Sequence, residues 1–199
     1  MALSWALLLL FSYLLGCTPF AYIAARLLRG VDIRTHGDRN SGAANAWRLL
    51  GARAGVAVFI ADMGKGAVAV LVTQAVIGGE AAPIAAGLAV IAGHNWPAYL
   101  GLRGGRGAAT LLGVLIALWP PAGLSLAAAG AIPLAIARSA VPPLVFFFVL
   151  FPVVAALTGA SSFLVVFAVL LMLVVAATHW ATSRGDAVED APAGVAQGR

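Results

Sequence analysis

Long apolar segments follow one another along almost the whole chain, separated only by short polar stretches. Of its 199 residues, 62% are hydrophobic and 10% are charged, whereas soluble domains have about 45–50% apolar and about 25% charged residues. A soluble fold of this length would leave roughly 30% of its surface exposed to water. So few charged residues cannot keep that surface polar. The sequence therefore predicts an integral membrane protein whose apolar exterior lies in a lipid bilayer.

The apolar segments lack the two-residue alternation of barrel strands, so they predict an all-α fold. A helix needs roughly 20 apolar residues to cross the hydrocarbon layer. We predict seven transmembrane helices, over approximately residues 3–25, 54–77, 82–101, 107–120, 122–137, 141–158 and 160–180. The fourth and fifth of these are short and have Pro120-Pro121 as their only turn, so one kinked span is the alternative.

The distribution of arginine favours seven spans over six. Cytoplasmic segments of membrane proteins collect Lys and Arg, and with seven spans every arginine falls on one side of the membrane. A single kinked span would put Arg138 and the C-terminal arginines on opposite sides. We therefore expect a multi-pass protein with its N-terminus outside and its C-terminus in the cytoplasm. This topology also accounts for the formal net charge of +5 without a nucleic-acid partner.

The two ends of the chain complete the predicted organisation. Residues 1–184 form a single transmembrane domain, and residues 185–199 have no apolar period, which predicts a disordered cytoplasmic tail. The sequence that ends at Cys17 looks like a lipoprotein cleavage site, but no Lys or Arg precedes its apolar run. We therefore expect one retained helix at the N-terminus.

Two polar segments are richer in glycine and arginine than simple connectors, residues 32–48 and 101–107. Glycines let backbone N–H groups approach a phosphate, asparagine amides donate further hydrogen bonds, and an arginine guanidinium offers a planar fork. The pattern indicates an anion-binding site, with a solvated loop and a tight turn as the alternatives. The second segment lacks the Lys-Ser or Lys-Thr of a P-loop, so nucleotide hydrolysis is not indicated.

Ionisable groups inside the predicted spans form a second set of candidates, because a charge in mid-membrane is costly and usually serves a function. Asp62 and Lys65 share one helix face, where they would form an ion pair, and contact with a substrate is the alternative. His94 is either a hydrogen-bonded helix residue or a site residue, and His179 lies at the predicted cytoplasmic surface. The three histidines are far apart and Cys17 has no ligand pattern around it, so we expect no metal and no other cofactor.

The sequence resembles the PlsY family of bacterial acyltransferases in matches that keep the same order and spacing, at residues 16–20, 32–34 with 40–48, 62–66, 93–97 and 103–107. The resemblance implies a seven-helix protein of the bacterial plasma membrane with its active site on the cytoplasmic face. It also implies transfer of a fatty acyl group from acyl phosphate to glycerol 3-phosphate, which gives lysophosphatidic acid in the first step of phospholipid synthesis. We expect this enzyme to be a monomer.

The same resemblance implies roles for individual residues. His179, Arg106 and Arg48 would be the catalytic residues, with the arginines holding phosphate groups and His179 beside glycerol 3-phosphate. The other substrate-binding and phosphate-binding residues would be Asp38, Asn40, Gly42, Asn45, Lys65, His94, Asn95, Gly104, Gly105, Gly107 and Ser139.

The chain departs from the family pattern at several positions. Asp38 and Arg39 stand where the family has a serine and a glycine, and we expect the added carboxylate to repel phosphate. Ala44 replaces a threonine, Thr182 an asparagine, and Arg106 the usual lysine. These departures leave two alternatives, a divergent or inactive homologue that binds a phosphorylated small molecule, and a carrier of such an anion or of a lipid phosphate.

Overall fold

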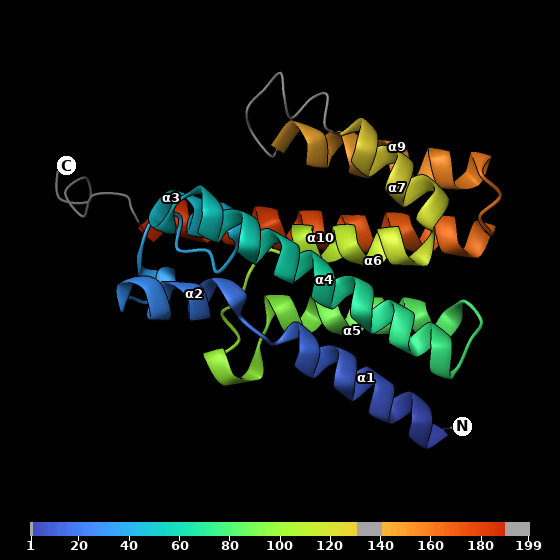
Figure 1. Ribbon diagram of the computed structural model, residues 1–199, viewed down its shortest axis with the longest axis horizontal. Coiled ribbons are helices and arrows are strands. Elements are labelled where there is room, and N and C mark those ends of the chain that lie inside the picture. Colours follow the sequence, from blue (N-terminus) through green and yellow to red (C-terminus); the bar gives the residue numbers. More distant parts are fainter. Residues whose placement is uncertain (1, 131–140, 190–199) are drawn as a thin grey trace, which may run out of the picture.

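The computed structural model of the chain describes residues 2–130 and 141–189, with side chains at 2–130, 144–178 and 180. Every regular element in this part of the chain is a helix, which confirms the predicted all-α fold (Figure 1). In order, the elements are α1 (Ala2–Gly16), α2 (Phe20–Arg29), η1 (Ile33–Thr35), α3 (Ala43–Leu50), α4 (Ala52–Val76), α5 (Ala81–Asn95), η2 (Ala98–Leu100), α6 (Ala108–Leu118), α7 (Pro120–Ala129), α9 (Val141–Leu157) and α10 (Ser162–Glu189).

The helices α4 and α6 touch backbone to backbone at a glycine on each. A Cβ atom at Gly66 of α4 would collide with the carbonyl oxygen of Thr110, and one at Gly113 of α6 would collide with that of Met63. Small residues bring membrane helices together in this way, because close backbone contact replaces the hydrophobic driving force that lipid removes.

The helices α1 and α5 pack by the same means. A Cβ atom at Gly16 of α1 would collide with the carbonyl oxygen of Val90, and one at Gly93 of α5 would collide with that of Tyr13. These contacts join α1 to α5. They also fix the C-terminal end of α5, from which the glycine-rich segment 101–107 departs.

Large apolar side chains lie both inside and outside the bundle. Its interior holds the fully buried Phe151, Ile84, Ile91, Leu111, Leu115 and Leu171. On its exterior lie apolar residues that each expose more than half of their own surface: Leu7, Ile60, Leu71, Val149 and Leu173. By length and composition, Ala2–Arg29 and Ala52–Val76 could cross a membrane. This arrangement is typical of helices that lipid covers.

The helix predicted over residues 3–25 is interrupted in the structure. α1 ends at Gly16 and α2 begins at Phe20, because Pro19 has no N–H group and disfavours helical backbone at Thr18 before it. The carbonyl oxygen of Thr18 instead accepts a hydrogen bond from Nζ of Lys65, at 3.0 Å. A side chain of α4 therefore satisfies the backbone at the break.

The chain turns back between α6 and α7. α6 ends at Leu118 and α7 begins at Pro120, whose missing N–H suits the first turn of a helix. A Cβ atom at Gly123 would come within 2.5 Å of the Cα of Ile116, whereas one straight helix would hold residues seven apart at about 10 Å. The structure therefore has two helices here, although residues 131–137 of the predicted fifth span lie outside the described residues.

The last helix passes the predicted end of the membrane domain. α10 continues to Glu189, so the boundary predicted at residue 185 falls inside this helix. The part of the predicted tail over residues 190–199 lies outside the described residues.

Candidate active site

The first polar segment is folded around Asn45, which lies in the first turn of α3 and is completely buried. Its Nδ2 donates to the carbonyl oxygens of Ile33 at 3.2 Å, His36 at 2.8 Å and Asn40 at 3.1 Å. Gly37 passes so close that a Cβ atom there would collide with Oδ1 of Asn45, and its φ of 62° favours glycine. Asn45 therefore shapes the loop by holding its backbone.

Arg34 links this loop to the turn after α5. Its Nε and Nη2 donate to the two carboxylate oxygens of Asp32 at 3.0 and 2.8 Å, and its Nη1 donates to the carbonyl oxygen of Leu100 at 2.8 Å. These hydrogen bonds from Arg34 hold the pKa of the Asp32 carboxyl below its ordinary value of 3.8. Most of the Arg34 guanidinium is thus engaged with protein groups, which indicates a structural role.

Arg48, in the last turn of α3, is paired with Asp38. Its Nη1 lies 2.7 Å from Oδ2 of Asp38, while 60% of the Arg48 side chain and 27% of the Asp38 side chain remain exposed. Oδ1 of Asp38 accepts a hydrogen bond from the backbone N–H of Asn40 at 3.3 Å. We expected Asp38 only to repel phosphate, and we expected Arg48 to bind phosphate. In the structure the Asp38 carboxylate pairs with Arg48.

The second segment returns along the end of α5. The N–H groups of Gly104 and Gly105 donate to the carbonyl oxygens of Asn95 at 3.1 Å and His94 at 3.0 Å. A Cβ atom at Gly105 would collide with Nε2 of His94 and would lie 3.0 Å from the carbonyl oxygen of Ser41. A side chain at position 105 would have to displace His94, and the glycine-rich turn lies directly against the first loop.

The C-terminal half of α10 reaches the same place. Nδ2 of Asn95 donates to Oγ1 of Thr178 at 3.4 Å, and a Cβ atom at Gly107 would lie 3.4 Å from a methyl group of Val175. Arg106, which lies between Gly105 and Gly107 in the sequence, is half-buried. His179 follows Thr178 in α10, although its side chain is not among those described.

Three polar atoms of the first polar segment and the end of α5 lack a hydrogen-bond partner among the described residues. They are Oγ of Ser41, Oδ1 of Asn45 and Oδ1 of Asn95, and all three residues are at least nine-tenths buried. Ser41 was not predicted as a site residue, although it lies between the candidates Asn40 and Gly42 in the sequence. Unsatisfied buried oxygens next to a glycine-rich turn fit a site that a polar ligand completes.

Asp62 and Lys65 of α4 form a buried cluster with His94 behind the glycine-rich turn. Nζ of Lys65 lies 2.7 Å from Oδ1 of Asp62, which confirms the predicted ion pair, and Nδ1 of His94 lies 3.4 Å from the same oxygen. Lys65 also contacts the Thr18 carbonyl oxygen and lies 5.6 Å from the centre of the Phe20 ring. All of these contacts of Lys65 are with protein groups, which favours the structural alternative.

The remaining candidates are placed as follows. Asn40 and Gly42 lie next to each other in the first loop, with the side-chain nitrogen of Asn40 3.0 Å from where a Cβ atom of Gly42 would be. Ser139 lies outside the described residues. Within the described part of the chain, no three His, Cys, Asp or Glu residues are grouped so that they could hold a metal ion.

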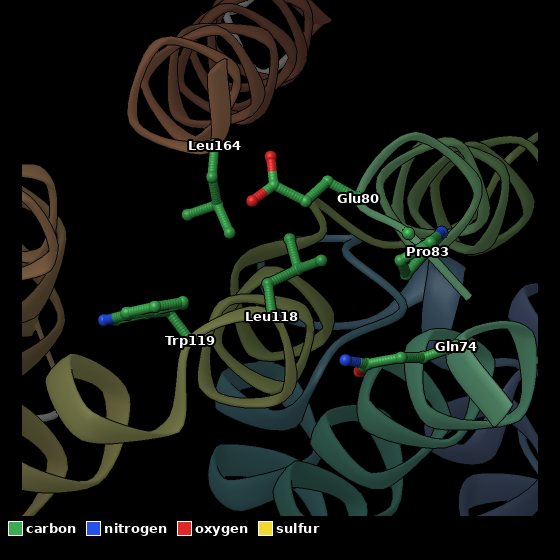
Figure 2. A pocket seen from close by; sticks show the side chains of 7 residues that line it. Gln74, Glu80, Pro83, Leu118, Trp119 and Leu164 are labelled. Carbon is green, nitrogen blue, oxygen red and sulfur yellow. The ribbon is translucent and has the colours of Figure 1, made fainter. Parts of the chain in front are cut away.

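A hollow of about 250 Å³ lies at the opposite end of the helices (Figure 2). It is lined by Gln74, Gly79, Glu80, Pro83, Leu118, Trp119 and Leu164. Figure 2 shows Glu80 and Leu164 reaching toward each other across it. Because these lining residues include a carboxylate and no arginine or lysine, the hollow does not suit a phosphate. The glycine–arginine segments at the other end remain the candidate site.

Comparison with known proteins identifies a family that matches most of the chain. The Glycerol-3-phosphate acyltransferase family matches residues 6–184. A protein of Dehalococcoides mccartyi named Glycerol-3-phosphate acyltransferase 4 is 39% identical over 178 residues, which are 89% of this chain and 96% of that protein. A Glycerol-3-phosphate acyltransferase of Halalkalibacterium halodurans is 50% identical over 122 residues, which are 60% of this chain and 59% of the relative.

A solved structure has the same fold. The crystal structure of PlsY (YgiH), described as an integral membrane glycerol 3-phosphate acyltransferase in its glycerol 3-phosphate form, is 30% identical and has a TM-score of 0.81. The match covers 89% of each chain. A family match over residues 6–184 and a shared fold over most of both chains lead to one conclusion: this chain belongs to the glycerol-3-phosphate acyltransferase family.

Proposed function

We propose that the protein transfers a fatty acyl group from acyl phosphate to glycerol 3-phosphate and so forms lysophosphatidic acid, the first step of phospholipid synthesis. One observation carries this proposal in addition to the family. Gly105 lies against both His94 and Ser41, so the segments 32–48 and 101–107 meet at one end of the bundle. Arginine and glycine from both segments are thereby available to phosphorylated substrates at one site.

The reaction needs no covalent enzyme intermediate, because acyl phosphate is already an activated acyl donor. A hydroxyl oxygen of glycerol 3-phosphate attacks the acyl carbonyl carbon, the bond from that carbon to the phosphate oxygen breaks, and inorganic phosphate leaves as the hydroxyl proton is released. The protein has to hold two substrates in line and stabilise negative charge on the leaving phosphate. In this proposal Arg48 and Arg106 hold phosphate groups and His179 lies beside glycerol 3-phosphate.

The proposed setting is a seven-span protein of the bacterial plasma membrane, acting as a monomer, with an outside N-terminus and a cytoplasmic active site. The one-sided distribution of arginine supports this topology. The position of the site supports it too, since both arginine segments and the C-terminal half of α10 gather at one end of the bundle (Figure 1). A fatty acyl donor would enter such a site from the bilayer while glycerol 3-phosphate arrives from the cytosol.

The experiment uses the purified protein in detergent with acyl phosphate, glycerol 3-phosphate and detection of lysophosphatidic acid. Arg106→Ala is expected to lower kcat by about 10²–10³, the usual effect of removing one charge-stabilising donor. Arg48→Ala is expected to raise the KM for a phosphorylated substrate. The matched control is Arg29→Ala, an exposed arginine in the last turn of α2, which should retain full activity. No lysophosphatidic acid from the folded wild-type protein would contradict the proposed function.

A further inference from the structure

Asp38 and Arg48 form an ion pair at the proposed phosphate site, and the two partners differ in how firmly they are held. Asp38 is fixed in the loop, because its Oδ1 accepts the Asn40 N–H while its Oδ2 lies 2.7 Å from Nη1 of Arg48. The loop itself is held by the buried Asn45. Arg48 is the more accessible partner, since 60% of its side chain is exposed.

A carboxylate and a phosphate oxygen compete for the same guanidinium N–H groups. Both prefer the edge of the planar guanidinium group, where two N–H groups point in one direction. An exposed ion pair is weak enough for an incoming anion to displace it. When a phosphate takes the place of Asp38 on Arg48, the carboxylate remains nearby, held by the Asn40 N–H, and repels the phosphate.

We propose that Asp38 sets the anion affinity of Arg48 by occupying the guanidinium whenever no phosphate is bound. This inference rests on the proposed function. Asp38 lowers the affinity of the site for phosphorylated substrates, and it also promotes release of the product phosphate by pairing with Arg48 again. Asp38 is thus a specificity-determining residue that disfavours doubly charged phosphates more than singly charged ones.

The size of the effect follows from charge and distance. One unit charge about 6 Å from a monoanion or dianion in water-like surroundings changes binding roughly three- to tenfold. Asp38→Asn keeps the shape of the side chain and removes the charge. In this variant the KM for a phosphorylated substrate, and the concentration of inorganic phosphate that halves the rate, are expected to fall by that factor. Both differences should shrink as salt is added, because exposed charges are screened.

The test compares the wild-type protein with Asp38→Asn, Asp38→Ser and Asp38→Glu, and uses two measurements. Lysophosphatidic acid formation gives the KM values and the inhibition by inorganic phosphate. Calorimetric titration with inorganic phosphate measures the affinity without turnover. Asp38→Glu keeps the charge and should stay close to the wild type. Asp38→Ser provides a second neutral variant in case Asp38→Asn does not fold.

The control is Glu80→Gln, which removes an exposed carboxylate at the far end of the bundle, where Glu80 accepts a hydrogen bond from Ser161. It should leave phosphate binding unchanged. Unaltered phosphate affinity in both neutral Asp38 variants, or an equal change in Glu80→Gln, would overturn the inference while the proposed function stands. Absence of turnover in the wild type would instead contradict the proposed function. The calorimetric titration with inorganic phosphate would still decide the role of Asp38.

Discussion

At the scale of single residues, Asn45 shows that a residue predicted to bind substrate can instead form hydrogen bonds with the backbone of its own loop. Its amide nitrogen faces three carbonyl oxygens of the first loop, and the side chain is completely buried. An asparagine in a glycine-rich segment predicts a hydrogen-bonding role, but its partners are set by the fold of the loop. The amide N–H groups of Asn45, which we expected to bind phosphate, instead hold the backbone of Ile33, His36 and Asn40 in place.

Asn45→Ala is expected to destabilise the protein by about 1–3 kcal/mol, because it leaves buried carbonyl groups without a donor. The loop that carries Asp38 would lose its shape, so the KM for a phosphorylated substrate should rise together with the loss of stability. Thermal unfolding in detergent and the acyltransferase assay measure the two effects. Gln74→Ala, an exposed amide at the far end of α4, should change neither quantity. A fully stable Asn45→Ala protein would show that the loop does not depend on these hydrogen bonds.

Residue types in the sequence predicted which segments come together better than the contacts that each residue makes. The segment 101–107 and the first loop do meet at one end of the bundle, where Gly105 lies against Ser41. The pairing of Arg48 with Asp38 could not be predicted, because Arg48 lies in α3 while Asp38, ten residues earlier, lies in an irregular loop whose path depends on Asn45. The orphaned Oγ of Ser41 likewise becomes visible only once its surroundings are known.

At the scale of helices, the contact between α4 and α6 depends on glycine. Gly66→Ala is expected to destabilise the protein by about 1–3 kcal/mol or more, because the new methyl group would meet the carbonyl oxygen of Thr110 and push the helices apart. Gly64→Ala is a matched control in the same helix, since a Cβ atom there has nothing within 4 Å. Thermal unfolding of the two variants provides the comparison. Equal stability of the two would mean that α4 and α6 tolerate a wider separation.

Lys65 joins α4 to the break between α1 and α2. Lys65→Met would remove the hydrogen bond to the Thr18 carbonyl oxygen and leave the buried charge of Asp62 without its lysine partner, at a cost of about 3–5 kcal/mol. The double variant Lys65→Met with Asp62→Asn should recover part of that loss, because no isolated charge remains. Unfolding in detergent measures all three proteins. A single variant as stable as the double one would mean that the charge of Asp62 is balanced elsewhere.

At the scale of the whole molecule, the arginine segments and Glu80 lie at opposite ends of the helix bundle. Both arginine segments lie at the end where α5 finishes and α6 begins, and the hollow around Glu80 lies at the other end. Such a division is expected when one end faces the cytoplasm, because positively charged segments are retained there.

In intact bacteria, a membrane-impermeant thiol reagent should therefore label Glu80→Cys and should label Arg103→Cys only after the membrane is opened. Both positions are exposed, and Cys17→Ala removes the single, buried native thiol. The extent of labelling before and after permeabilisation is the measurement. Labelling of both positions in intact cells, or the reverse order, would contradict the proposed topology.

The sequence by itself determined the class of the molecule: an all-α membrane protein of the glycerol-3-phosphate acyltransferase family, with two glycine–arginine segments as its candidate site. Those properties depend on hydrophobicity, charge and local motifs, which each short stretch of chain carries on its own. Only the tertiary structure decided that Asp38 pairs with Arg48 and that Lys65 supports the break at Thr18. The physical reason is that such pairings follow from how the backbone packs, and helices that touch at glycines bring together groups whose separation in sequence says nothing about their distance.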